Sequence, residues 1–228
     1  MFPRLATGLA PALALVALLA LGACQTPHEG RVDPTLFPRQ TDARAIFDGP
    51  GAVLTDATSL ETVVLGETLA DRRPMQMPIG RIVHEASLEA FAEVFKGGVQ
   101  AVDRLGGGPA TAMPLVAVRL ANFVYRDRLQ YIVPLPLPLV AVEKWRLDVQ
   151  IAVDVRLLDD KGQVLWSSTY DSGVQVFDEG TFTEPTALLE RPESLVRLTH
   201  ETAFRLMQQA ARDVGEWLRK ERLRERRL

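Results

Sequence analysis

The sequence contains one cysteine and three histidines among 228 residues. One cysteine cannot form an internal disulfide, and so few thiols and imidazoles leave little material for a zinc site. His84-Glu85 and His200-Glu201 both lack the second histidine, one helical turn further on, that an H-E-x-x-H protease motif requires. We therefore expect no metal and no cofactor.

Motifs of nucleophilic and phosphate chemistry are also missing. No G-x-S-x-G elbow is present, and Ser172 falls in a predicted strand or bulge, where a serine is ordinary. The glycine run Gly106–Pro109 lacks the G-K-[ST] ending of a phosphate loop, and its proline removes a backbone donor. We predict no catalytic residue and a protein that is not an enzyme.

There is no excess of basic residues. The 26 Lys and Arg residues stand against 29 Asp and Glu residues, which gives a formal net charge of −3. Proteins that bind nucleic acid usually carry a basic stripe, so no nucleic-acid partner is expected. The length suits one domain with a real core.

The first 23 residues are ordered like a signal peptide. Arg4 is the only charge before an uncharged run over residues 5–23 that is rich in Ala and Leu. The run closes on the four residues Leu21, Gly22, Ala23 and Cys24. These four resemble the lipobox of bacterial lipoproteins. The resemblance implies that residues 1–23 are removed and that Cys24 becomes the lipid-bearing first residue of the mature chain.

An uncleaved membrane anchor is the alternative, because nineteen uncharged residues approach the roughly 20 that a spanning helix needs. Pro11 and two glycines would make a poor spanning helix, and no cluster of positive charge follows. In Gram-negative lipoproteins an aspartate after the cysteine commonly signals retention in the inner membrane. Here Gln25 follows, so the resemblance implies the outer membrane, with the protein facing the periplasm.

Residues 24–50 are polar or turn-forming and show no sustained period, so we predict a lipidated, flexible tether. As a coil it would reach about 28 Å, with Ile46 and Phe47 as candidates for docking. Residues 51–228 form the predicted single globular domain.

Apolar periodicity within this domain predicts strands and two amphipathic helices. Strands are expected at 52–54, 61–69 and 115–125, a turn at 55–59, a hairpin over 145–177 with its turn at 159–162, and helices from 79 to about 97 and from 193 for about seven turns. The predicted fold class is α+β, a mostly antiparallel sheet with a long hairpin and both helices packed on one face.

Two features are candidate partner surfaces. Prolines at alternate positions in Val133–Val140 favour an extended run rather than a central strand. Its aliphatic residues would either fold over the core or form a loop that meets a membrane or a protein. The loop candidates are Leu135, Leu137, Leu139 and Val140.

The second feature is the basic carboxyl end. Residues 219–228 hold six cations and two anions, which favour a helix C-terminus through the helix dipole. The alternative is contact with anionic lipid or an acidic partner. The residues concerned are Arg222, Arg224, Arg226 and Arg227.

The lipobox, the tether, the hairpin with Leu157–Leu165 and the last helix together resemble small periplasmic lipoproteins. The nearest groups are the ABC-transport auxiliary and the lipopolysaccharide-assembly lipoproteins. This resemblance implies an accessory component of an envelope assembly, such as lipid transport or export, with an envelope protein as partner. The alternative is an envelope hydrolase, or a carrier of an apolar ligand in a cleft between sheet and helices.

Overall fold

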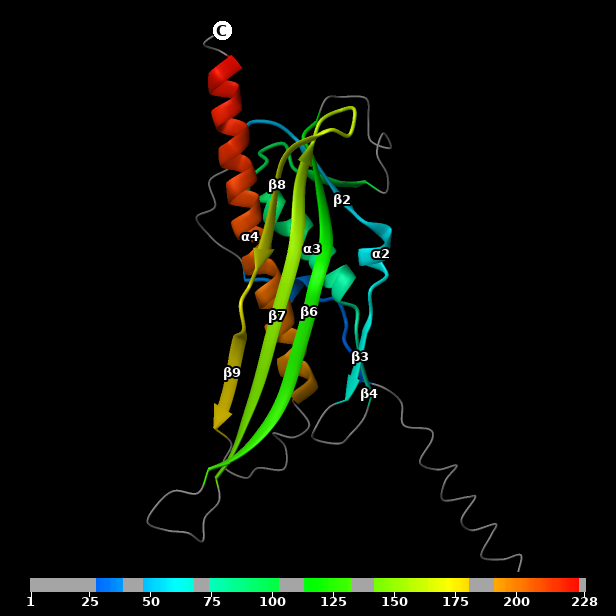
Figure 1. Ribbon diagram of the computed structural model, residues 1–228, viewed down its shortest axis with the longest axis vertical. Helices are drawn as coiled ribbons and strands as arrows, with labels where there is room; N and C mark the ends of the chain where they lie inside the picture. Colours follow the sequence, from blue (N-terminus) through cyan, green and yellow to red (C-terminus); the bar gives the residue numbers. More distant parts are fainter. Residues whose placement is uncertain are drawn as a thin grey trace, which may run out of the picture.

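The protein is described from a computed structural model, over residues 28–38, 47–67, 74–102, 113–132, 142–180 and 191–225. Figure 1 shows a tall molecule in which β6, β7 and α4 run along the long axis. In chain order the elements are β1 (His28–Glu29), η1 (Pro34–Leu36), β2 (Gly51–Thr55), α2 (Ala57–Leu60), β3 (Val64–Glu67), β4 (Pro74–Met77), α3 (Ile79–Ala92), β5 (Val99–Val102), β6 (Leu115–Ile132), β7 (Val142–Leu158), β8 (Val164–Asp171), β9 (Gln175–Gly180) and α4 (Arg191–Glu225).

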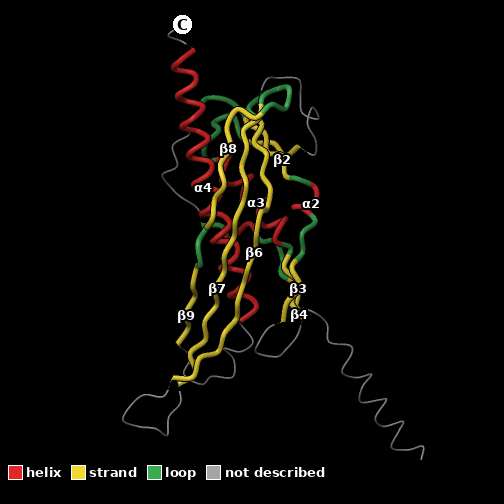
Figure 2. The backbone as a smooth tube through the Cα atoms, viewed as in Figure 1, coloured by secondary structure: helices red, strands yellow, loops and turns green. Residues whose placement is uncertain are grey.

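The larger sheet is mixed (Figure 2). Its six strands have the order β5-β2-β6-β7-β8, and β9 also pairs with β7. β2 is parallel to both β5 and β6, whereas β7 is antiparallel to β6, β8 and β9. The prediction of a mostly antiparallel sheet is therefore wrong. Because α3 lies between β2 and β5 in the chain, a helical crossover returns β5 beside β2 in the same direction. A second sheet has the order β1-β4-β3.

The longest ladder joins β6 to β7, from Leu115 opposite Leu158 to Ile132 opposite Val142. Its register shifts between Leu120 and Asn122, as at a β-bulge. From Leu147 onward, where the side chains of β7 are described, the alternate apolar residues are buried, as the two-residue period predicts. These residues are Leu147, Val149, Ile151, Val153, Val155 and Leu157.

The predicted turn after β7 is present. The Asp159 carboxylate accepts hydrogen bonds from the backbone N–H groups of Lys161 at 2.9 Å and Gln163 at 2.6 Å. Gly162 takes the left-handed φ of 79° that this turn needs. A second left-handed glycine, Gly173 with φ 61°, separates β8 from β9. The single returning strand that the sequence predicts is therefore two strands, both paired with β7.

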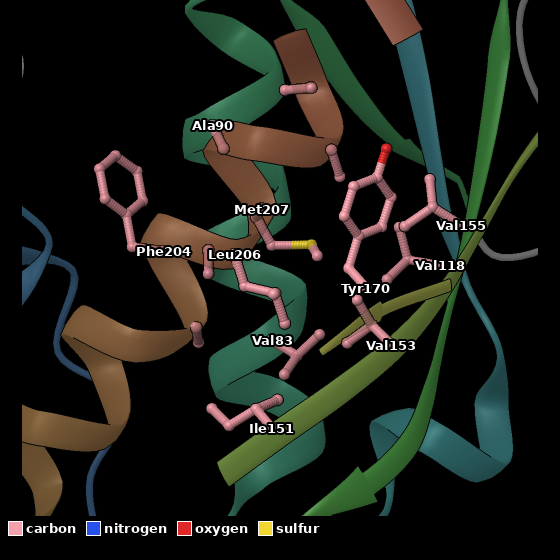
Figure 3. Packing of buried hydrophobic residues seen from close by; sticks show 14 of the residues in the cluster. Val83, Ala90, Val118, Ile151, Val153, Val155, Tyr170, Phe204, Leu206 and Met207 are labelled. Atoms are coloured by element: carbon pink, nitrogen blue, oxygen red, sulfur yellow. The ribbon is translucent and has the colours of Figure 1, made fainter. Parts of the chain in front are cut away.

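The two long helices lie behind the sheet in the view of Figure 1. α3 begins at Ile79, as predicted, and α4 covers 35 residues, which is longer than the predicted seven turns. α3 contacts β2, β5 and β6, and α4 contacts β7, β8 and β9. Figure 3 shows the shared core, to which α3 contributes Val83 and Ala90, α4 contributes Phe204, Leu206 and Met207, and the strands contribute Val118, Ile151, Val153, Val155 and Tyr170.

The start of α3 lies against α2. α2 occupies the predicted turn over residues 55–59, where Asp56 caps the helix by accepting from the Ser59 N–H at 3.2 Å. Gly80 in α3 donates its N–H to the Thr62 carbonyl at 3.2 Å. A Cβ added at Gly80 would lie 1.7 Å from the carbonyl oxygen of Ser59. Only glycine fits this contact without a backbone shift.

Part of the predicted tether is folded. β1 pairs with β4, and Phe37 and Phe47 are only 5% and 6% exposed. Phe47 packs edge-on against Phe95 with ring centroids 5.5 Å apart, so the expected docking of Phe47 is confirmed. Ile46 lies outside the described residues. The prediction of a flexible tether up to residue 50 thus differs from the structure, because burial of these two phenyl rings favours docking.

Candidate functional site

Most of the residues that the sequence singles out lie outside the described part of the chain. Arg222 and Arg224 fall in the last turn of α4, but their side chains are outside the described part of the structure. The other such residues are Leu21, Gly22, Ala23, Cys24, Leu135, Leu137, Leu139, Val140, Arg226 and Arg227. Among the helices within the described ranges, none is both long and apolar enough to cross a membrane.

Close to the lipobox in sequence, a segment is clasped by α4. We call residues 28–37 the strap. β1 at its start runs parallel to β4, and the backbone N–H of Asp33 donates to Nε2 of His200 at 3.0 Å. Phe37 at its end stacks on Phe204 and also contacts the His200 ring, with centroids 5.4 Å apart in both cases. The strap is therefore held at three points along its length.

His200 uses both of its ring nitrogens in this clasp. Because Nε2 accepts from Asp33, it carries no proton, and Nδ1 donates to the Val196 carbonyl at 2.7 Å. The side chain is fully buried. Burial lowers the pKa of His200, while the Val196 carbonyl and the Asp33 carboxylate act in the opposite sense. The strap covers the ring, so His200 is a buried residue and not a histidine on the exposed surface of α4.

Acid should loosen the strap. The pKa of His200 is lower in the folded protein than its unfolded value of about 6.5. As the pH falls below about 6.5, the unfolded form binds the proton first, so the stability of the clasp falls with the pH. We expect the Asp33 amide to lose hydrogen-exchange protection between about pH 7.5 and about pH 5.5, after correction for intrinsic exchange rates.

Two glutamine variants separate this effect from general acid sensitivity. His200→Gln removes the titrating ring and should abolish the pH dependence of the Asp33 amide. His84→Gln is the matched control and should retain it. Equal protection of Asp33 at both pH values in the unmodified protein would contradict the clasp mechanism.

The other described helix histidine is bound separately. Nδ1 of His84 lies 2.8 Å from the hydroxyl of Thr55 on β2, far along the chain from the strap. Within the described ranges, no group of three or more His, Cys, Asp and Glu side chains is placed to hold a metal ion.

A small polar cleft of about 140 Å³ opens between α4 and the junction of β8 with β9. The Asp171 carboxylate accepts from the Gln150 side-chain amide and from the Gly173 N–H. The Ser172 hydroxyl accepts from the Ile151 N–H at 2.9 Å. The lining residues are Asp171, Ser172, Gln175, Thr202, Arg205, Leu206 and Gln209.

The cleft does not favour the alternative functions. Its serine and aspartate are engaged in shaping the strand junction, and no histidine is among the residues that line it. A cleft of about 140 Å³ is also smaller than ligand pockets, which typically measure roughly 300 to 1,000 Å³. Ser172 thus has the structural role that the sequence assigned to it.

Comparisons with known proteins add solved structures only. No known family and no curated protein matches the sequence. The chain is similar to uncharacterized lipoprotein B of Nitrosomonas europaea, with 12% identity, a TM-score of 0.36 and coverage of 78% of this chain and 87% of that one. It is similar at 9% identity and a TM-score of 0.38 to a Helicobacter pylori homolog of a neuraminyllactose-binding hemagglutinin, covering 81% and 97%.

A third similar structure, from Caulobacter crescentus, is described as a lipoprotein; identity is 17%, the TM-score 0.31 and coverage 78% and 91%. Lipoproteins thus recur among the similar structures. Likeness at these TM-scores decides neither the fold nor the function of this chain, so the functional proposal rests on its own residues.

Proposed function

We propose that this chain is a bacterial lipoprotein, held in the outer membrane by lipid on Cys24, with its folded domain in the periplasm. The lipobox Leu21–Cys24 at the end of a signal-like segment is the observation that carries the proposal. Each acyl chain contributes about 0.8 kcal/mol per buried methylene, and attachment is lasting when there is more than one chain. Gln25 supports the outer rather than the inner membrane.

The domain acts as a non-catalytic binding or scaffolding component of an envelope assembly, such as a lipid-transport or export machine. The missing catalytic motifs and the two candidate partner surfaces support this role. The test is the mass of the protein extracted from membranes, which should show cleavage before Cys24 and added acyl chains. Crosslinking in intact cells should then capture an envelope protein. An unprocessed mass would refute the anchor, and recovery only as a lone monomer would refute the scaffold.

The described elements that lead into the two candidate surfaces reach opposite ends of the domain. The proline loop joins Ile132 to Val142, the last pair of the β6–β7 ladder. α4 runs in the same direction as β7, away from this pair, because Arg197 lies over Phe177 of β9 whereas Asp213 binds Tyr170 of β8. Figure 1 shows the carboxyl end of α4 far from the hairpin tip.

The proline loop can be tested with charge. Leu135→Asp combined with Leu137→Asp should weaken assembly or membrane contact, because carboxylates resist transfer into apolar surroundings. The thermal midpoint should stay unchanged. The readouts are recovery of crosslinked partners and the melting curve of the extracted protein.

A double variant at the other end of the sheet is the matched control. Val164 and Leu165 are exposed aliphatic residues of β8, at 52% and 49%. Val164→Asp with Leu165→Asp should leave the crosslinks intact. If the leucine pair instead unfolds the protein, the loop covers the core and is not a partner surface.

A further inference from the structure

The strap fixes where the lipid leaves the domain. If Cys24 carries the lipid, as proposed above, only residues 25–27 separate it from β1, so His28 is four residues further along the chain. Four extended residues span at most about 14 Å. When the strap is docked, the first residue of β1 is therefore close to the lipid headgroups. A long flexible coil would hold it further away.

The strap also fixes which end of the domain faces the lipid. β1 is parallel to β4, and β4 starts toward the end of the molecule where the β6–β7 hairpin has its tip (Figure 1). His200, which holds the strap, is close along α4 to Arg197, and Arg197 lies over Phe177, the partner of Leu147 in the tip-side half of β7. We call the end of the domain at which β6 ends and β7 begins the anchor end.

We propose that the docked strap holds the domain upright on its own bilayer, with the anchor end against the headgroups. The surface is an interface with lipid, and the occupant is the bilayer that carries the acylated Cys24. α4 has 35 residues and so carries its carboxyl end about 50 Å along the domain. The basic end of the chain then faces away from that bilayer, which favours an acidic partner over lipid as its contact.

Release of the strap would remove this orientation. Within the described ranges, the next docked residue after it is Phe47, whose N–H donates to the Val94 carbonyl at 3.1 Å. The link from Cys24 would then have 23 residues and a typical coil length of about 26 Å. A domain on such a link can turn freely.

Energy transfer to the membrane measures the orientation directly. Since the only cysteine is acylated in the lipoprotein, a single added cysteine can carry a fluorescent donor. Arg126→Cys labels the exposed outer part of β6, opposite Asp148, and Lys161→Cys labels the turn beyond Leu158. The ten β7 residues between these levels span about 33 Å. The full lipidated chain is placed in phosphatidylcholine–phosphatidylglycerol vesicles with acceptor-labelled headgroups.

The efficiency of energy transfer to the headgroups should be about twofold higher for the donor at residue 126 than for the donor at residue 161, because the two sites are about 33 Å apart along β7. Phe37→Asp, which expels the ring from between His200 and Phe204, should abolish the difference. Pro38→Asp adds the same charge at the exposed residue that directly follows the strap and should preserve it. Should Phe37→Asp fail to fold, Phe37→Ala serves with Asp33 exchange as the readout of release.

Equal or reversed quenching in the lipidated, unmodified chain would overturn the upright orientation. A difference that survives strap release would show that the strap does not set it. A chain whose mass shows no acyl group would overturn the proposed anchor instead. Measuring the mass of the protein by mass spectrometry before reconstitution distinguishes a missing anchor from a wrong orientation.

Discussion

Cys24→Ser should release or mislocalise the protein, and this is the largest effect we expect from any single change. The serine hydroxyl does not replace the thiol as lipid acceptor, so every acyl chain attached through this residue is lost. At about 0.8 kcal/mol per buried methylene, we expect at least a tenfold drop, in order of magnitude, in the membrane-bound fraction. Cell fractionation followed by immunoblotting measures it.

Thr26→Ser is the matched control for this variant. It exchanges one hydroxyl residue for another two positions further on, leaves the lipobox intact and should fractionate with the membrane. If Cys24→Ser remains membrane-bound at the same size as the unmodified protein, Cys24 is not the anchor, and if that size is the full length, the uncleaved-helix alternative gains support.

Gly80→Ala should destabilise the domain strongly, although alanine is normally the better helix former by about 1 kcal/mol. The added Cβ would lie 1.7 Å from the Ser59 carbonyl oxygen, which is backbone and cannot rotate away. Either α2 or the start of α3 must move, and overpacking of this kind costs about 1 to 3 kcal/mol. We expect a loss of about 2 kcal/mol or more in the free energy of unfolding.

Urea unfolding of the mature protein in mild detergent measures this loss. Arg81→Ala changes the next residue of α3, which is exposed, and should alter stability by less than about 0.5 kcal/mol. A Gly80→Ala protein as stable as Arg81→Ala would show that α2 yields easily, and that the glycine is not required by the packing.

Local patterns in the sequence predicted the local parts of the fold. The period of two along β7, the period of the helix that begins at Ile79, and the turn built by Asp159 all depend on residues close in the chain. For the same reason the proposed lipid site at Cys24 depends on only four consecutive residues, and it lies outside the described part of the structure.

What the sequence did not reveal depends on distant contacts. β5 has four residues and becomes a strand beside β2 only because α3 returns the chain there. The strap has the prolines and polar residues of a linker, and its β1 has two residues. Two signals were present: Asp33 before Pro34, which is typical of a helix cap, and the lone aromatic Phe37. Neither could point to His200.

The same clasp has a consequence for the order in which the protein matures. The hydrogen bond from Asp33 to His200 joins residues 167 positions apart, and closing so long a loop has a large entropic cost. The chain is synthesised from its amino terminus, so Asp33 emerges long before its acceptor exists. Strap docking is therefore a late folding event. In a lipoprotein, the modifying enzymes would meet Cys24 on a loose arm, and completion of the last helix would then draw the domain down to the membrane.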